Sequence, residues 1–185
     1  MKDVYKIIAV SLLLGAIAFW QNKALANRTT KKREMKNNNN FTESDAKTAI
    51  EKVKDVFGRD EAKIVERLMR LETAHFKSDQ YKKTGSPGME IGGKNTTYPY
   101  GWRQPVKFWD ENPRYKPTGI YTRPENKTGI KKSFIVFPSV TAAALTLAYI
   151  LKQRNWNAGS WYSTNIAKQN EYNAYINKIS NRFIL

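Results

Sequence analysis

The chain has 185 residues, no cysteine and one histidine, and its 32 basic residues outnumber its 16 acidic ones to give a formal net charge of +16 at pH 7. This length fits one ordinary domain with an appendage, and the lack of cysteine excludes disulfides and thiolate chemistry. A His- or Cys-based metal site is not expected, and we expect no cofactor. The charge predicts a polyanionic partner, and nucleic acid, anionic lipid and bacterial cell wall all satisfy it.

The N-terminal segment, residues 1–26, is predicted to meet a membrane. Its residues 7–20 carry no charge, Lys2 and Lys6 precede them, and Ala24-Leu25-Ala26 has the small-x-small form of a cleavage site. These features fit a signal peptide, whereas a membrane anchor of about 20 residues must include the polar flanks of the apolar run. Both interpretations stay open, with a retained anchor slightly favoured, and both give the chain membrane lipid as a partner.

Basic residues are denser after the apolar run than before it. Residues 27–40 lack a core and are predicted to be a basic, Asn-rich linker. Its basic residues are Arg28, Lys31, Lys32, Arg33 and Lys36. The positive-inside rule would keep the C-terminal side with the cytoplasm, unless these charges bind anionic head groups instead. We expect a membrane-anchored protein whose domain lies in the periplasm or cell envelope, or inside a membrane-containing virion.

The folded domain is predicted to begin with two helices. Thr42 and Asp45 form a variant capping box before an apolar helical stripe, and Gly58 ends that helix. Asp60 is predicted to cap a second helix that reaches Glu72.

The rest of the domain changes character twice. Residues 78–137 are rich in Gly, Pro, Asn and aromatic residues without a helical period, so we expect a functional loop region with short strands near 119–122 and 133–137. A helix after Ser139 is apolar nearly all round, which predicts a central position. Residues 155–163 are predicted to be a loop, and a last helix is expected to begin near Thr164. Residues 41–185 are therefore predicted to form one α+β domain, with a mainly helical core and a small aromatic-rich β-lobe.

A carboxylate continues the apolar face of the second helix. Val65, Leu68 and Glu72 lie at i, i+3 and i+7, so two aliphatic side chains and then a carboxylate share one face. Such a carboxylate either turns out to solvent at the helix end or is partly buried. Partial burial raises its pKa, as a general acid near neutral pH requires. Spacing alone favours the solvated alternative.

The residues around this carboxylate resemble a known motif. Glu72-Thr73-Ala74-His75-Phe76-Lys77-Ser78 is similar to the Glu-Thr-Gly-Trp-Gly-Lys-Ser stretch of bacterial endo-β-N-acetylglucosaminidases of glycoside hydrolase family 73, which include flagellar muramidases and autolysins. Ala74, His75 and Phe76 stand in place of the family's Gly-Trp-Gly.

Four further segments between residues 60 and 180 continue the resemblance in the same order. The first two are Gly88-Met89-Glu90, similar to Gly-Ile-Lys, and Thr122-Arg123-Pro124-Glu125, similar to Thr-x-Glu with one extra residue. The third is Phe134-Ile135-Val136-Phe137-Pro138-Ser139, similar to Phe-Arg-x-Tyr-x-Ser with Ile135 in place of Arg. The fourth is Tyr162-Ser163-Thr164-Asn165, similar to Tyr-Ala-Thr-Asp, with Tyr172 beyond it. The resemblance implies a lysozyme-like fold, with a sugar cleft between the helices and the β-lobe and peptidoglycan as the partner.

The resemblance also implies the catalytic carboxylates. Glu72 would be the general acid that protonates the glycosidic oxygen between amino sugars. Glu125 matches the β-lobe Glu that activates water or stabilises the oxocarbenium-like transition state, and its rivals are Asp110, Glu111 and Glu90. Without a second acid, the substrate's acetamido group would assist. In a lytic transglycosylase an internal sugar hydroxyl would attack.

Aromatic residues complete the expected site. Tyr162 matches the family's cleft tyrosine, which implies contact with the acetamido group or with developing positive charge. His75, one turn past Glu72, is expected to touch substrate or orient the acid, and Tyr172 is counted among the substrate-binding residues. The rings expected to supply sugar-stacking faces are Tyr98, Tyr100, Trp102, Trp109 and Trp161. Core packing is the competing interpretation for each ring.

The predicted function is that of a membrane-associated muralytic enzyme that cleaves β-1,4 glycosidic bonds of peptidoglycan, in phage entry, lysis or cell-wall remodelling. A basic nucleic-acid-binding protein would also account for the charge and the aromatic residues. No Gly-rich phosphate loop or nucleic-acid signature is present, and the membrane segment argues against specific nucleic-acid binding. A non-catalytic virion or envelope protein with a lysozyme-like domain is the remaining alternative.

Overall fold

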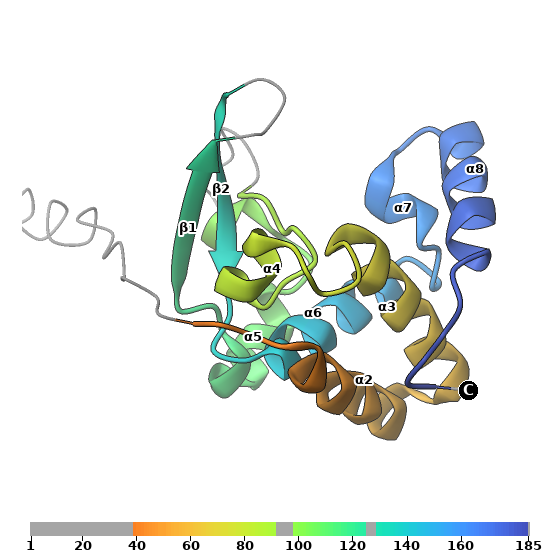
Figure 1. Ribbon diagram of the computed structural model, residues 1–185, viewed down its shortest axis with the longest axis horizontal. Helices are drawn as coiled ribbons and strands as arrows, with labels where there is room; N and C mark the ends of the chain where they lie inside the picture. Colours follow the sequence, from red (N-terminus) through yellow and green to blue (C-terminus); the bar gives the residue numbers. More distant parts are fainter. Residues whose placement is uncertain (1–38, 92–97, 125–128, 185) are drawn as a thin grey trace, which may run out of the picture. The chain divides into compact units, whose positions relative to one another are not determined.

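The structure, a computed structural model (Figure 1), describes residues 39–91, 98–124 and 129–184. Its contacts divide the chain into two compact units, Met1–Glu34 and Met35–Leu185, and everything described belongs to the second unit. The predicted membrane segment, the linker up to Asn38, and Glu125 lie outside the described residues. Within the described part, the helices are too short or too polar to cross a membrane.

Two helices open the described domain, as predicted. α2 (Glu43–Phe57) begins with the expected capping box, in which the Thr42 N–H donates to Asp45 Oδ2 at 2.8 Å and the Asp45 N–H donates to Thr42 Oγ1 at 3.3 Å. The helix ends at Gly58, whose φ of 115° is readily adopted only by glycine. α3 (Arg59–Glu72) follows at once.

The prediction that Asp60 caps α3 is wrong. Because α3 begins directly after Gly58, that glycine is the N-cap, and no side chain makes a capping hydrogen bond. Asp60 instead lies inside the first turn, where a negative charge suits the helix dipole, and its Oδ1 is 3.4 Å from Lys63 Nζ. The end of α3 at Glu72 is as predicted.

A central apolar helix forms the core, as its composition predicts. α6 (Val140–Gln153) begins at Ser139, whose Oγ accepts a hydrogen bond from the Ala142 N–H at 3.1 Å. Ten of the 14 residues of α6 are buried, and both α2 and α3 pack against it. Its apolar side chains therefore meet neighbouring elements rather than solvent.

The predicted strands are confirmed, with slightly different ends. β1 (Gly119–Pro124) and β2 (Lys131–Val136) form an antiparallel two-stranded sheet in which Gly119 lies opposite Val136. α4 (Asp79–Thr84) packs against this sheet, as Figure 1 shows beside β2.

Short helices interrupt the region that was expected to hold only loops and strands, and in this respect the prediction is wrong. α4 and α5 (Val106–Glu111) have six residues each, which is too short for a helical period to stand out. Two 3-10 turns that begin with proline, η1 (Pro99–Gly101) and η2 (Pro113–Tyr115), flank α5. We call residues 98–124 and 129–136 the lobe.

Two helices that we call the α7–α8 hairpin follow α6. α7 (Gly159–Tyr162) lies where a loop was predicted, and α8 (Ile166–Asn177) begins close to the expected start near Thr164. A Cβ on Gly159 would lie 2.2 Å from the backbone oxygen of Gln169, so only glycine permits this close approach.

Side-chain amides hold the α7–α8 hairpin together. Asn157 Nδ2 donates to Gln169 Oε1 at 2.8 Å, and Asn173 Nδ2 donates to Asn157 Oδ1 at 2.9 Å. The Gly159 N–H donates to Asn173 Oδ1 at 2.6 Å. The described residues thus form a mainly helical α+β domain with a small antiparallel sheet, as predicted, and its last two helices are tied by polar contacts.

Candidate active site

Glu72 is the last residue of α3 and is half-buried. Val65 and Leu68 on the same helical face are fully buried, so the structure favours the buried alternative over the solvated one. Burial raises the pKa of Glu72, and a hydrogen bond from Tyr172 opposes part of that rise. A carboxyl group with a raised pKa keeps its proton to higher pH, which is the requirement for a general acid.

Tyr172 of α8 donates a hydrogen bond from its hydroxyl to Glu72 Oε1, across a separation of 100 residues in the sequence. Burial, followed by the interaction with Glu72, raises the pKa of Tyr172, so the hydroxyl keeps its proton and remains a donor. Among the described residues, no hydrogen bond reaches Glu72 Oε2. The arrangement fixes one carboxyl oxygen and leaves the other without a hydrogen bond from the described residues.

Tyr162 stacks on the tyrosine that binds Glu72. Its ring is parallel to that of Tyr172, with centroids 4.9 Å apart and an interplanar angle of 3°. Tyr162 is 63% exposed, so much of its ring faces solvent. The contact between Tyr162 and Glu72 therefore runs through Tyr172, and the outer surface of Tyr162 is open to a ligand.

Trp102 and Trp161 form a second stacked pair. Their centroids are 5.4 Å apart and their planes meet at 27°. Trp102 comes from the lobe and Trp161 from α7, next to Tyr162 in the chain. The structure thus joins four of the predicted aromatic and catalytic residues into two stacks, and the stack of Tyr162 on Tyr172 reaches Glu72 through the Tyr172 hydroxyl.

The turn after Glu72 has an unusual backbone. Ala74, His75 and Phe76 have φ values of 49°, 56° and 67°, so three consecutive residues with side chains adopt the left-handed region. Thr73 supports the turn, since its Oγ1 donates to the Met69 carbonyl at 2.6 Å and accepts from the Phe76 N–H at 2.8 Å. Such conformations persist only where the surroundings enforce them, and they are common at functional sites.

Phe76 is the residue of this turn that packs into the core. Its ring lies 5.7 Å from that of Phe183 and 5.4 Å from that of Tyr81, and the guanidinium of Arg70 lies 5.7 Å from its centroid. His75, by contrast, is exposed, and its side chain makes no hydrogen bond or ion pair with the described residues. A contact between His75 and a substrate stays a prediction.

The chain's last residues reach the turn through a buried carboxylate, Glu66. Its Oε1 accepts from the N–H groups of Arg182 at 2.6 Å and Phe183 at 3.1 Å, and its Oε2 accepts from the Ile184 N–H at 3.2 Å and from Asn181 Nδ2 at 3.0 Å. Four donors compensate this fully buried charge. Glu66 therefore holds the C-terminal residues in the position where Phe183 packs on the turn.

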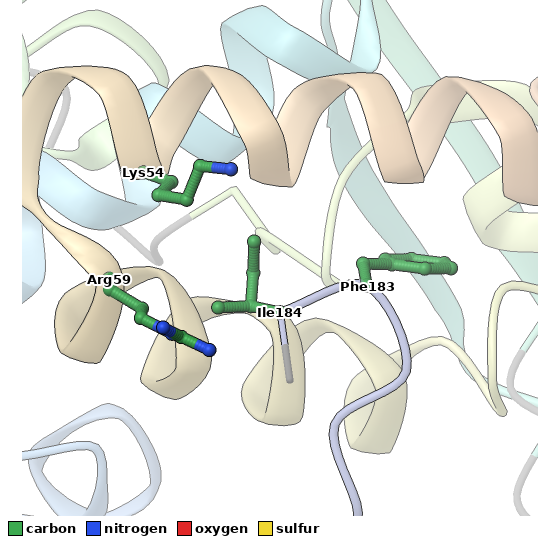
Figure 2. Close-up of a pocket in the computed structure, with 4 residues that line it drawn as sticks. All are labelled: Lys54, Arg59, Phe183 and Ile184. Atoms are coloured by element: carbon green, nitrogen blue, oxygen red, sulfur yellow. The ribbon is translucent and has the colours of Figure 1, made fainter.

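Figure 2 shows how the C-terminal residues end between α2 and α3. Ile184 and Phe183, with Lys54 of α2 and Arg59 of α3, line an open pocket of about 350 Å³. Ile184 is buried and belongs to the hydrophobic core, so this segment closes the core on the side away from the sheet.

Arg70 is the least well satisfied buried group near the turn. It is 1% exposed, and its Nε and Nη1 make no hydrogen bond within the described part of the chain. Its Nη1 lies 4.0 Å from carboxylate oxygens of Glu43 and Glu66, and its guanidinium also lies 5.7 Å from the ring of Phe183. Burial lowers the pKa of Arg70. In place of hydrogen bonds, these charge and cation–π contacts stabilise its buried guanidinium.

Tyr100 packs within the lobe rather than in the site. Its ring meets Trp109 edge to face at 6.3 Å, and its hydroxyl donates to the Pro117 carbonyl at 3.3 Å. Trp109 is buried and donates from Nε1 to Thr146 Oγ1 at 3.0 Å. For these two rings the core-packing alternative is the one observed.

The second carboxylate is less well defined than the first. Glu125 lies outside the described residues. Asp110 and Glu111 on α5 are exposed and pair with Lys116 at 3.5 Å and Lys107 at 3.8 Å. Glu90 pairs with Lys132 at 3.4 Å, and its carbonyl accepts a hydrogen bond from Trp102 Nε1 at 2.8 Å. Of the three described rivals, Glu90 is thus the one connected to the aromatic stacks.

Three functionally placed residues were missed by the sequence reasoning. Glu66 and Arg70 have the i, i+4 spacing of an ordinary surface ion pair, and nothing local reveals their burial. Gly159 gives a weak signal, because a single glycine in a predicted loop needs no special explanation. In the described part of the chain, no group of three or more His, Cys, Asp and Glu side chains is arranged to hold a metal ion.

Comparison with protein families, curated proteins and solved structures found no match to this chain.

Proposed function

We propose that this protein cleaves the glycan strands of peptidoglycan, with Glu72 as the general acid of a lysozyme-like domain. The observation that carries the proposal is the environment of Glu72, a half-buried carboxyl at a helix end whose pKa is raised by burial and whose Oε1 is fixed by Tyr172. The Tyr162–Tyr172 stack, which reaches the acid, and the Trp102–Trp161 stack offer the flat apolar surfaces that sugars bind.

The left-handed turn adds support to the resemblance with family 73 glycoside hydrolases. In that motif the residues corresponding to Ala74 and Phe76 are glycines. Both positions have positive φ here, the backbone region that favours glycine. A sequence that keeps the turn without its glycines needs added contacts to hold it, and the packing of Phe76 against Phe183 and Tyr81 supplies them.

The proposed reaction begins with a protonated Glu72. Its Oε2 gives the proton to the glycosidic oxygen as the bond to the anomeric carbon breaks, and the leaving sugar carries that proton away. The Tyr172 hydroxyl then stabilises the carboxylate that remains. Water or an internal sugar hydroxyl attacks the oxocarbenium-like centre, and the proton it loses restores Glu72. The first acceptor gives hydrolysis and the second gives a lytic transglycosylase.

The test of the acid is Glu72→Gln, which keeps the shape of the side chain and removes its transferable proton. The full-length variant in mild detergent is expected to lose at least about a hundredfold of its clearing of a peptidoglycan suspension. Glu171→Gln, on the exposed surface of α8, is the matched control and keeps full activity. Undiminished clearing by folded Glu72→Gln, with folding checked by circular dichroism, contradicts the assignment.

The second carboxylate is assigned to Glu125 as part of this proposal. Glu125→Gln is expected to cost far more clearing activity than Asp110→Asn, because Asp110 is exposed and paired with Lys116 at 3.5 Å. Glu90→Gln is measured in parallel, since the carbonyl of Glu90 binds Trp102. A ranking with Asp110 or Glu90 above Glu125 moves the role to that residue. Three equal, small losses favour assistance by the substrate's acetamido group.

The proposal includes a membrane association through residues 1–26. The apolar run with basic flanks supports either a retained anchor or a cleaved signal. Intact-mass measurement of the protein from membrane and soluble fractions separates them. A retained anchor gives the full-length mass in the membrane fraction, and cleavage after Ala26 gives a soluble chain of lower mass.

A further inference from the structure

The stack of Trp102 on Trp161 connects the lobe to the α7–α8 hairpin. The two rings come from different segments, and among the described residues no hydrogen bond joins residues 98–124 to α7 or α8. The stack is therefore an apolar contact that can open without leaving a buried polar group unpaired, because Trp102 Nε1 keeps its own acceptor.

Trp102 is anchored to the sheet side of the site. Its Nε1 donates to the Glu90 carbonyl at 2.8 Å, and Glu90 bridges to Phe134 of β2. The neighbouring Ile91 N–H donates to the Ser133 carbonyl at 2.8 Å. The indole of Trp102 therefore moves with the lobe.

Trp161 is anchored to the α7–α8 hairpin, which carries Tyr172, the hydrogen-bond partner of Glu72. It precedes Tyr162, whose ring stacks on Tyr172, and Tyr172 donates to Glu72. The Trp161 N–H donates to the Ala158 carbonyl at 3.0 Å, which fixes its backbone within α7. The Trp pair and the Tyr pair that leads to Glu72 thus meet at two consecutive residues of α7.

We propose that Trp102 and Trp161 are a glycan clamp: in the free protein the two indoles cover each other, and they separate to take an N-acetylated amino sugar between them. The inference rests on the proposed function. Indole faces suit the apolar C–H faces of a pyranose ring. Opening loses one ring–ring contact and gains two ring–sugar contacts, so a bound sugar favours the open state.

The clamp makes a prediction about substrate length. Its Trp161 is linked to Glu72 through the neighbouring Tyr162 and Tyr172, so we expect a productive glycan to occupy both the clamp and the bond beside the acid. Oligomers that reach both are bound more tightly than short ones, because the second contact is made within one complex.

The test uses the optical coupling between stacked indoles, which gives paired bands of opposite sign in circular dichroism. Trp102→Phe and Trp161→Phe are each expected to abolish this signal. Trp156→Phe is the control and leaves it intact, since Trp156 packs edge to face on Phe57 at 5.6 Å and takes no part in the pair. The protein is the full-length chain in mild detergent, with Glu72→Gln added to prevent turnover.

The probe is a soluble β-1,4-linked N-acetylglucosamine hexamer, with binding followed by calorimetry. The paired bands are expected to fade with the calorimetric Kd, and Trp102→Ala or Trp161→Ala to raise that Kd about tenfold, with part recovered by Phe. Hexamer binding that leaves the bands unchanged, or Kd values unaltered in both Ala variants, overturns the clamp and leaves the role of Glu72 standing. Absence of hexamer binding also overturns the clamp, and Glu72-dependent clearing then decides the proposed function separately.

Discussion

The two sides of the candidate site are held together by different forces. On one side, ten of the 14 residues of α6 are buried among apolar neighbours, and α2 and α3 pack against it. On the other side, two of the 12 residues of α8 are buried, Gln169 and Ile176, and side-chain amides tie α8 to α7. Glu72 belongs to the apolar side, and Tyr172, which fixes its carboxyl group, belongs to the polar side.

This difference separates stability from activity. Apolar burial supplies most of the free energy of folding, so the α2–α3–α6 core should set the stability of the domain. The α7–α8 hairpin buries little and depends on directional hydrogen bonds, so it contributes less stability but fixes the geometry around the acid. Substitutions on the apolar side should therefore lower stability more than activity, and substitutions on the polar side should lower activity more than stability.

Gly159→Ala should give the largest loss of activity. The added Cβ would lie 2.2 Å from the Gln169 oxygen, so α7 must move and the stacks that include Trp161 and Tyr162 are lost. We expect peptidoglycan clearing to fall at least about a hundredfold, since small misplacements near a catalytic group are costly. Thermal melting of the core should change much less.

Gly119→Ala is the control, because nothing lies within 4 Å of its added Cβ. Hydrogen exchange is the second measurement. Protection should fall in α7 and α8 and persist in α6. Full activity in Gly159→Ala, or a large loss of hydrogen-exchange protection in α6, would contradict the proposed separation of stability and activity between the two sides.

Leu147→Ala should lower the stability of the domain much more than its activity. Leu147 is fully buried in α6, so its truncation is expected to lower the free energy of unfolding by about 3 kcal/mol. At a temperature well below the melting transition, kcat should stay within about twofold of the original value, because Leu147 takes no part in the bond from Tyr172 to Glu72 or in the aromatic stacks. Denaturant titration and steady-state kinetics check the two halves of this statement. A kcat that falls in proportion to stability would mean that the core also sets the site.

Tyr172→Phe should give a smaller effect with a defined pH signature. The Tyr172 hydroxyl stabilises the ionised form of Glu72 and so lowers its pKa, against the larger raising effect of burial. Removal of the hydroxyl raises the pKa of Glu72 further. The alkaline limb of kcat/KM, where a general acid loses its proton, is expected to move to higher pH.

The maximum rate of Tyr172→Phe should also drop about tenfold, because Oε1 is no longer fixed. Tyr175→Phe, an exposed tyrosine of the same helix, should change neither quantity. An alkaline limb that stays in place or moves to lower pH would show that Tyr172 does not act on Glu72.

Capping residues and apolar periodicity predicted most of the apolar side, except for the cap of α3 and the burial of Glu66 and Arg70. Thr42, Gly58 and Ser139 mark helix ends through local hydrogen bonds or backbone angles, and a stripe of buried residues spans several turns of each long helix. These signals lie within a few residues of the structure they specify, so the sequence carries them directly.

The polar side could not be predicted in the same way. α7 is four residues long, which is too short for a helical period to show. α8 was predicted as a helix, but only two of its residues are buried, so its pattern did not reveal what it packs against. The bond from Tyr172 to Glu72 spans 100 residues, and the bond from the Arg182 N–H to Glu66 spans 116. Such pairings depend on how the whole chain folds. The resemblance around Glu72 singled it out as the proposed acid without revealing that Tyr172 binds it.

The central claim is that Glu72 donates the proton that breaks a glycosidic bond of peptidoglycan. Mass spectrometry of purified peptidoglycan treated with the full-length protein and with Glu72→Gln tests it most directly. The account predicts shortened glycan strands with new reducing or anhydro ends from the original protein, and none above background from the variant. Intact strands with cut peptides, or the same new ends from both proteins, would contradict it.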